Sequence, residues 1–140
     1  MTAPSRARVA MRWLMSAFYG GAGLLHLVRP DGFLPIVPAW VPEPRMVVIA
    51  TGVAEILGAL GLLVPPLRKA AGLGLALYAL CVLPANIKHA AEGIVLAGLP
   101  SSWWYHAPRL ALQPVLIWGT LYAGGVIDWP WRQEGKVKLG

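Results

Sequence analysis

The sequence has one cysteine, Cys81, and few charged residues of either sign. A lone cysteine excludes an internal disulfide, a Cys-x-x-Cys redox motif and a cysteine cluster for a metal. Because Cys81 lies inside an apolar run, we expect it to be a small buried core residue. Charged residues make up 13% of the chain, whereas soluble domains usually carry about 25%. The chain therefore lacks the polar surface with which a water-soluble domain covers itself.

Apolar residues are in excess instead. They make up 57% of the 140 residues, and the mean hydropathy is +0.60. A chain of this length forms one domain, and the core of one small domain does not accommodate so much apolar surface. The excess must face something other than water, and lipid is the medium that suits it.

Four apolar stretches approach the roughly 20 helical residues that a bilayer core requires. Each stretch is apolar all round the helix, and the chain offers no amphipathic helices that bury such stretches in water. The sequence therefore predicts an all-α, integral membrane four-helix bundle, with residues 1–140 as a single membrane domain. The predicted transmembrane helices are residues 9–28, 46–64, 70–87 and 107–126.

Small residues are expected where these helices pack most closely, because in lipid they let helix backbones approach each other. The candidates are Gly52, Gly58, Gly61, Gly72 and Gly74.

The connections between the helices differ in character. Residues 65–69 predict a tight turn. Residues 29–45 combine several prolines with apolar side chains, which predicts a folded, proline-rich loop at the membrane interface with Trp40 at headgroup level. Residues 88–106 predict a short amphipathic helix over residues 90–99, followed by an aromatic belt. The aromatic residues expected at the two interfaces are Trp103, Trp104 and Tyr105 on one side and Trp129 and Trp131 on the other.

Lys and Arg residues are more frequent at the two termini and in the short turn than in the two long connections. By the positive-inside rule, both termini are expected in the cytoplasm, with the chain integral to the cytoplasmic (inner) membrane. The net charge of +6 does not indicate a nucleic-acid partner, because the basic residues are spread over segment ends and form no basic face.

Polar residues from all four helices are predicted to gather toward the side that carries the long connections. Arg109 and Gln113 are four residues apart and share a helix face. The candidate ligand-binding residues are His26, Glu55, Asn86, Arg109, Gln113 and Trp118, the last as an aromatic that stacks on a flat ring. His26 and Glu55 are the candidate catalytic residues.

Glu55 carries the strongest physical argument. It lies nine residues into the second helix, roughly 13 Å from the start of that helix at 1.5 Å per residue. A charged carboxylate at that depth is costly, so Glu55 should be protonated or paired with a cation. Arg109 is the first expected partner and His26 the second. Two explanations stay open: a polar clamp that fixes helix packing, and a site that binds a ligand or handles protons.

No metal site is predicted. His89 and His106 lie on the same side as His26, but their spacing matches no metal-binding motif.

Several short motifs resemble DoxX-like small membrane proteins. Residues 23–26, 29–30 and 33–38 resemble the first part of that family, residues 52–58 and 61–63 its second helix, and residues 84–87 and 109–114 its third and fourth helices. The resemblance covers about residues 12–120. It implies a four-helix membrane domain, a link to quinone-coupled sulfur oxidation or oxidative-stress complexes, and functional residues at His26, Glu55, Asn86, Arg109 and Gln113.

The leading hypothesis for function is a module that binds a quinone or a lipid and belongs to a membrane oxidoreductase system. No resident cofactor is visible in the sequence, so a bound quinone or lipid is the expected ligand. The expected partners are membrane lipids, oxidoreductase subunits and further copies of the chain, without nucleic acid. Two alternatives are a cofactor-free membrane enzyme that acts on a lipid or sterol, and a structural or assembly subunit.

Overall fold

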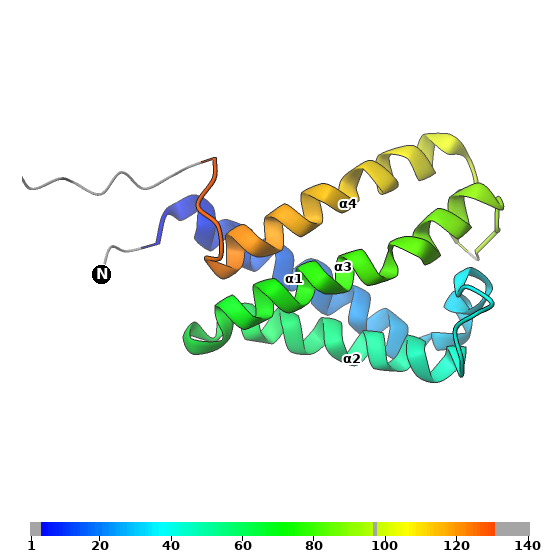
Figure 1. Ribbon diagram of the computed structural model, residues 1–140, viewed down its shortest axis with the longest axis horizontal. Helices are drawn as coiled ribbons and strands as arrows, with labels where there is room; N and C mark the ends of the chain where they lie inside the picture. Colours follow the sequence, from blue (N-terminus) through cyan, green and yellow to red (C-terminus); the bar gives the residue numbers. More distant parts are fainter. Residues whose placement is uncertain (1–3, 97, 131–140) are drawn as a thin grey trace, which may run out of the picture.

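Four α-helices make up most of the chain. The computed structural model describes residues 4–96 and 98–130, and these contain helices, turns and loops but no strand. The α-helices are α1 (Arg6–Val28), α2 (Pro44–Leu63), α3 (Arg68–Ala91) and α4 (Trp103–Gly124), and two 3₁₀ helices are η1 (Pro30–Ile36) and η2 (Pro65–Leu67) (Figure 1). Each of the four predicted segments overlaps one α-helix, with ends that differ by up to four residues, which confirms the all-α prediction.

Local sequence signals explain the helix ends. Ser5 caps α1 by accepting a hydrogen bond from the backbone N–H of Arg8. Pro44 opens α2 at the first turn, where its missing N–H costs nothing. At the end of α4, Gly125 has a φ of 74°, a left-handed conformation that favours glycine.

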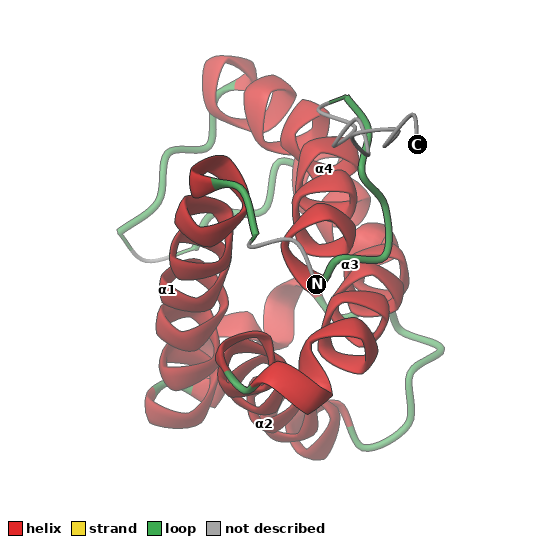
Figure 2. Cartoon of the chain, turned by 90° about the vertical axis from the view of Figure 1, so that its left-hand side faces the viewer, coloured by secondary structure: helices red, strands yellow, loops and turns green. Residues whose placement is uncertain are grey.

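The helices form a bundle in which neighbours along the chain pack together. α1 packs mainly against α2 and α3 mainly against α4, while smaller contacts join α2 to α3 and α1 to α4 (Figure 2). The start of α1, the end of α4 and the η2 turn lie at one end of the bundle, which we call the terminal end. The η1 segment and the α3–α4 connection lie at the opposite end, which we call the loop end (Figure 1).

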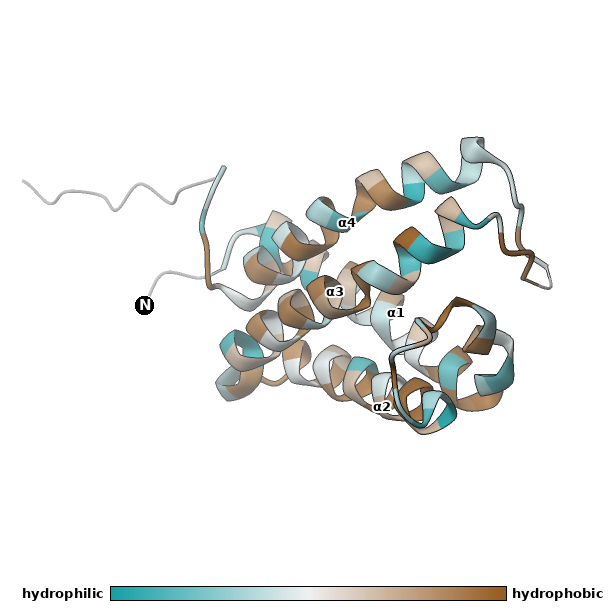
Figure 3. Cartoon of the chain, turned by 45° about the vertical axis from the view of Figure 1, so that its right-hand side comes forward, coloured by the Kyte–Doolittle hydropathy of each residue, from teal (hydrophilic) through white to brown (hydrophobic). Residues whose placement is uncertain are grey.

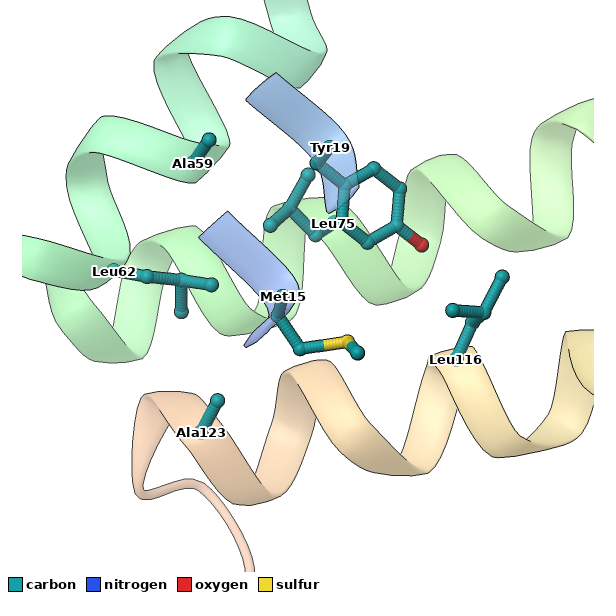
Figure 4. Close-up of a cluster of buried hydrophobic side chains, with 7 residues drawn as sticks. All are labelled: Met15, Tyr19, Ala59, Leu62, Leu75, Leu116 and Ala123. Atoms are coloured by element: carbon teal, nitrogen blue, oxygen red, sulfur yellow. The ribbon is translucent and has the colours of Figure 1, made fainter. Parts of the chain in front are cut away.

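The core contains side chains from all four helices. Figure 4 shows Met15 and Tyr19 of α1 beside Leu75 of α3 and Leu116 of α4. The complete cluster is Met15, Tyr19, Ala59, Leu62, Leu75, Leu116 and Ala123.

Glycines mark the closest helix contacts. A Cβ on Gly23 of α1 would lie 2.6 Å from the carbonyl oxygen of Gly52 in α2, and a Cβ on Gly72 of α3 would lie 3.0 Å from Cα of Gly124 in α4. Side chains likewise crowd the Cβ positions of Gly58 and Gly61. The prediction of close packing at Gly74 is wrong, because nothing lies within 4 Å of its Cβ position.

Large apolar side chains cover the outward faces of the bundle. Brown segments run along all four helices in Figure 3, and teal segments lie mostly toward the ends of the bundle. Representative exposed residues are Trp13, Phe18, Leu24, Leu57, Leu60, Leu73, Leu77, Leu80, Leu112 and Val115. Two segments, Pro44–Leu63 and Pro65–Ala91, are long and apolar enough to cross a membrane.

Three details differ from the sequence predictions or lie outside the described residues. Cys81 is exposed rather than buried, because it lies on the outward face of α3. No helix spans residues 90–99: α3 continues to Ala91, and the following described residues form turns and loop. Trp131, expected at an interface, lies outside the described residues. The proline-rich connection is folded, as predicted, with Pro30 and Ile36 buried and Trp40 exposed.

Candidate functional site

A buried acid–imidazole pair joins α1 to α2. Nδ1 of His26 lies 2.9 Å from Oε2 of Glu55 and 2.8 Å from the carbonyl oxygen of Ala22. Because that carbonyl can only accept, Nδ1 carries a hydrogen and donates it to Ala22, while the Glu55 carboxylate lies within ion-pair distance of the same nitrogen. Glu55 is only 3% exposed, so the imidazole provides the polar contact that a buried carboxylate needs.

The helix contact at Gly23 and Gly52 makes this pairing possible. A Cβ on Gly52 would lie 2.8 Å from Cβ of His26, and a Cβ on Gly23 would lie 3.0 Å from Cβ of Glu55. The missing side chains thus let α1 and α2 approach until the imidazole reaches the carboxylate. Larger residues at either glycine would push the two helices apart.

Aromatic residues enclose the pair. Phe33 of η1 stacks on the His26 ring with centroids 4.0 Å apart and planes 20° apart. Tyr78 of α3 interacts through its hydroxyl with Glu55 and with Thr51. Tyr19 of α1 packs edge-on against Tyr78 at 6.1 Å. Phe33 therefore covers the pair from the loop end, while Tyr78 borders it from α3.

An apolar groove reaches this site from the side of the bundle. It has a volume of about 310 Å³ between α2 and α3, and Tyr78 belongs to its lining. Its lining includes three glycines, Gly58, Gly61 and Gly74, and three leucines, Leu57, Leu67 and Leu75. The groove therefore joins an apolar, outward-opening surface to a hydroxyl that contacts Glu55.

Arg109 does not pair with Glu55, so the prediction of Arg109 as the first partner of the carboxylate is wrong. The second expected partner, His26, does pair with Glu55. The Arg109 guanidinium instead donates to Oδ1 of Asn86 and to Nδ1 of His89. It also lies over the ring of Tyr105, 5.7 Å from the centroid. One cluster of polar residues was expected, but the structure has two. Arg109 belongs to the second, because Asn86 and His89, one turn apart on α3, lie within its reach.

The cluster between α3 and α4 extends through His106. The rings of His89 and His106 meet edge to face at 4.7 Å, and both residues are buried. Neither nitrogen of His106, nor Nε2 of His89, has a hydrogen-bond partner among the described residues. Among the described residues, no group of three or more His, Cys, Asp or Glu side chains is placed to hold a metal.

Gln113 and Trp118 do not join the His26–Glu55 pair. Gln113 is buried on α4, and its Oε1 has no hydrogen-bond partner among the described residues. Trp118 stacks on Tyr122 at 5.5 Å and donates from Nε1 to the carbonyl oxygen of Trp129. These contacts place Trp118 toward the terminal end.

Sequence reasoning missed two residues that border the pair. Tyr78 carries the one side-chain hydroxyl in the apolar stretch of residues 70–87, and that isolation is a signal that would have found it. Phe33 offers no comparable signal, because its contact with His26 depends on how η1 folds back.

Replacing Arg109 by methionine should lower the free energy of unfolding by about 1–3 kcal/mol. The change removes hydrogen bonds from two acceptors, Asn86 and His89, one of them on a buried side chain. Replacing Arg45 by methionine is the control, because its ion pair with Asp31 is exposed and should change stability by less than about 1 kcal/mol. Denaturant unfolding of the two purified variants tests this, and equal losses would contradict it.

The fold and the site together define a small, outwardly apolar helical bundle with a buried acid–imidazole pair. Residues 15–123 match a family model described as Domain of unknown function (DUF8561). The match covers more than half of the chain, which therefore belongs to this family. It includes every candidate site residue from His26 to Trp118. Comparison with the curated proteins gives no match, and comparison with the solved structures gives none.

Proposed function

We propose that this chain is a DoxX-like, integral protein of the bacterial inner membrane that binds an amphipathic molecule, a quinone or a lipid, for a membrane oxidoreductase system. The observation that carries the proposal is the apolar groove between α2 and α3, which is lined by Tyr78, a residue that interacts with the buried Glu55. The DUF8561 description names no activity and speaks neither for nor against the DoxX-like resemblance.

The apolar outward faces support the membrane location. Two helical segments have the length and hydropathy of transmembrane helices, and α1 and α4, with 23 and 22 residues, are also long enough to span a bilayer core. In water the exposed leucines and tryptophans of all four helices would promote aggregation. In lipid the same surface is in its preferred medium, with all four helices crossing the bilayer.

The distribution of charge supports cytoplasmic termini. Described acidic residues other than Glu55 and Asp128 lie at the loop end, where Asp31 pairs with Arg45 and Glu92 with Lys88. The terminal end is mostly basic. Lys and Arg, the residues that set orientation, are also more frequent in the terminal segments and the short turn than in the two long connections, which favours the terminal end in the cytoplasm.

The ligand head would lie at His26, Glu55 and Tyr78, and its apolar chain in the groove. Carbonyl or hydroxyl oxygens of a quinone or lipid head match the donors and acceptors of these three side chains. The leucines and glycines of the groove suit an apolar chain that enters sideways from the bilayer.

Alkaline carbonate washing of membranes tests the membrane location. The protein should stay in the pellet, as an integral protein does. Release into the supernatant would contradict the proposal.

Extraction of the purified protein with organic solvent tests the ligand. We expect quinone or lipid to be retained by the wild type and reduced about tenfold or more in Glu55→Gln, because a hydrogen-bonded charged group contributes about 1.5–3 kcal/mol. Arg109→Ala is the comparison, since Arg109 belongs to the separate α3–α4 cluster. Unchanged ligand in Glu55→Gln would remove this function and favour a structural or assembly subunit.

A second candidate is a cofactor-free enzyme that moves protons on a lipid or sterol. The observation that favours it is the contact of a carboxylate, an imidazole and a phenol, which can all carry protons. Turnover of a sterol or isoprenoid by the wild type, lost in His26→Gln, would support it. Absence of turnover across a lipid panel, with ligand still bound, would leave the binding module as the function.

A further inference from the structure

Three arginines at the terminal end converge on the end of α4. The arginine cluster consists of Arg8 and Arg12, one turn apart on α1, and Arg68 at the start of α3. Nε of Arg12 donates to the carbonyl oxygen of Ala123 at 2.8 Å. The Cβ position of Gly124 lies 2.7 Å from the backbone carbonyl oxygen of Arg68, so the start of α3 packs against the end of α4, and the Cβ position of Gly125 lies 3.6 Å from Nη1 of Arg8. Residues 123–125 thus lie against the side chains of Arg8 and Arg12 and against the backbone of Arg68, whose guanidinium extends to the end of α2.

Most acceptors of the arginine cluster are uncharged. Arg68 donates to the carbonyl oxygens of Leu62 and Leu63, and Arg12 donates to a carbonyl oxygen. Asp128 is the one carboxylate that pairs with the cluster among the described residues, and it pairs with Arg8. Each guanidinium has five N–H donors, so the partly exposed Arg8 and Arg68 keep spare donors, while the buried Arg12 adds to the surplus of positive charge.

The surplus is larger at this end of the bundle than at the loop end, where the described acidic residues are more numerous. At the loop end, Arg45 and Lys88 each have a carboxylate partner. Carbonyl oxygens hold the arginines in place but do not neutralise them. An anion with several acceptor oxygens would supply both the charge and the hydrogen bonds that the cluster lacks.

The surroundings of the cluster indicate where the anion comes from. Trp13, next to Arg12, and Leu67, next to Arg68, are exposed apolar side chains. An anion that carries acyl chains can bind the guanidiniums with its phosphate while its chains cover these residues. Free phosphate can bind the guanidiniums but has no acyl chains to cover the apolar residues.

We infer that the arginine cluster binds the phosphate headgroup of an anionic phospholipid in the cytoplasmic leaflet. The inference rests on the membrane location proposed above and concerns a site at the opposite end from His26 and Glu55. Clusters of basic residues at the cytoplasmic ends of membrane helices bind such headgroups. The bound phosphate would link α1 and α3 to the end of α4.

Native mass spectrometry of the full chain in neutral detergent tests this, with phosphatidylglycerol and phosphatidylcholine as probes. The wild type should bind phosphatidylglycerol about tenfold more tightly, and Arg68→Gln should lose about fivefold of that affinity. Lys69→Gln is the matched control, because Lys69 is the exposed next residue of the same turn. It should retain nearly all of the affinity. Arg8→Gln, a half-buried position, provides a second variant with the same expected loss.

Three results would overturn the inference: equal affinity of the wild type for the two lipids, equal losses in Arg68→Gln and Lys69→Gln, or binding of inorganic phosphate as tight as that of phosphatidylglycerol. A protein that stays in carbonate-washed membranes but shows one of these results would contradict the lipid site alone. Release by carbonate would contradict the membrane location and the lipid site together.

Discussion

Substitution of Gly72 by leucine should destabilise the bundle by about 3 kcal/mol or more. A Cβ at this position would lie 2.7 Å from the carbonyl oxygen of Thr120 and 3.0 Å from Cα of Gly124. Both atoms belong to the backbone of α4, so no side-chain rotation relieves the overlap, and overpacking of this kind costs at least 1–3 kcal/mol. Unfolding in detergent, followed by circular dichroism, measures the loss.

Gly74→Leu is the control for this prediction. It lies on the same helix, and nothing lies within 4 Å of its Cβ position. We expect it to be neutral or slightly stabilising, because glycine is the weaker helix former. Equal losses of unfolding free energy in Gly72→Leu and Gly74→Leu would show that the α3–α4 contact is not the reason why residue 72 must be small.

Replacing His26 by leucine should cost about 3 kcal/mol or more, because it leaves the Glu55 carboxylate buried without its imidazole partner. The double variant His26→Leu/Glu55→Leu should be more stable than the single variant, since it leaves no buried charge. Denaturant midpoints of the two variants and the wild type measure this.

Retained ligand should be lost in both of these variants, which separates binding from stability. If the double variant were as unstable as His26→Leu, the unpaired Glu55 carboxylate would not be the cause of the lost stability. If both variants kept the full amount of ligand, the pair would act only as a clamp between α1 and α2.

The sequence predicted the helices well because each of them is a long apolar run between proline, glycine or charged residues. The predicted gathering of polar residues from all four helices is divided between two clusters, and Trp118 belongs to neither of them. Helix rotation was not predictable, since a run that is apolar all round has no periodicity to show which side faces inward. That is why Cys81 was expected inside and is exposed.

The same ambiguity explains the exchange of partners at the site. Glu55 and Arg109 looked like the natural pair because of their charges. The close approach at Gly23 and Gly52 instead brings His26 to Glu55, and Arg109 finds Asn86 and His89 on the helix beside its own. Such short-range choices depend on backbone contacts between helices.

The central claim is that an amphipathic ligand lies in the groove between α2 and α3 with its head at Glu55. Gly74 lines this groove and has open space at its Cβ position, so Gly74→Phe should fill the groove while the bundle stays folded. Gly21→Phe is the matched control, because Gly21 also has open space but lies on α1, away from the groove. The measurement is the amount of quinone and lipid extracted per folded protein. We expect a large loss of extracted ligand in Gly74→Phe and none in Gly21→Phe, and equal amounts in the two variants would contradict a ligand in this groove.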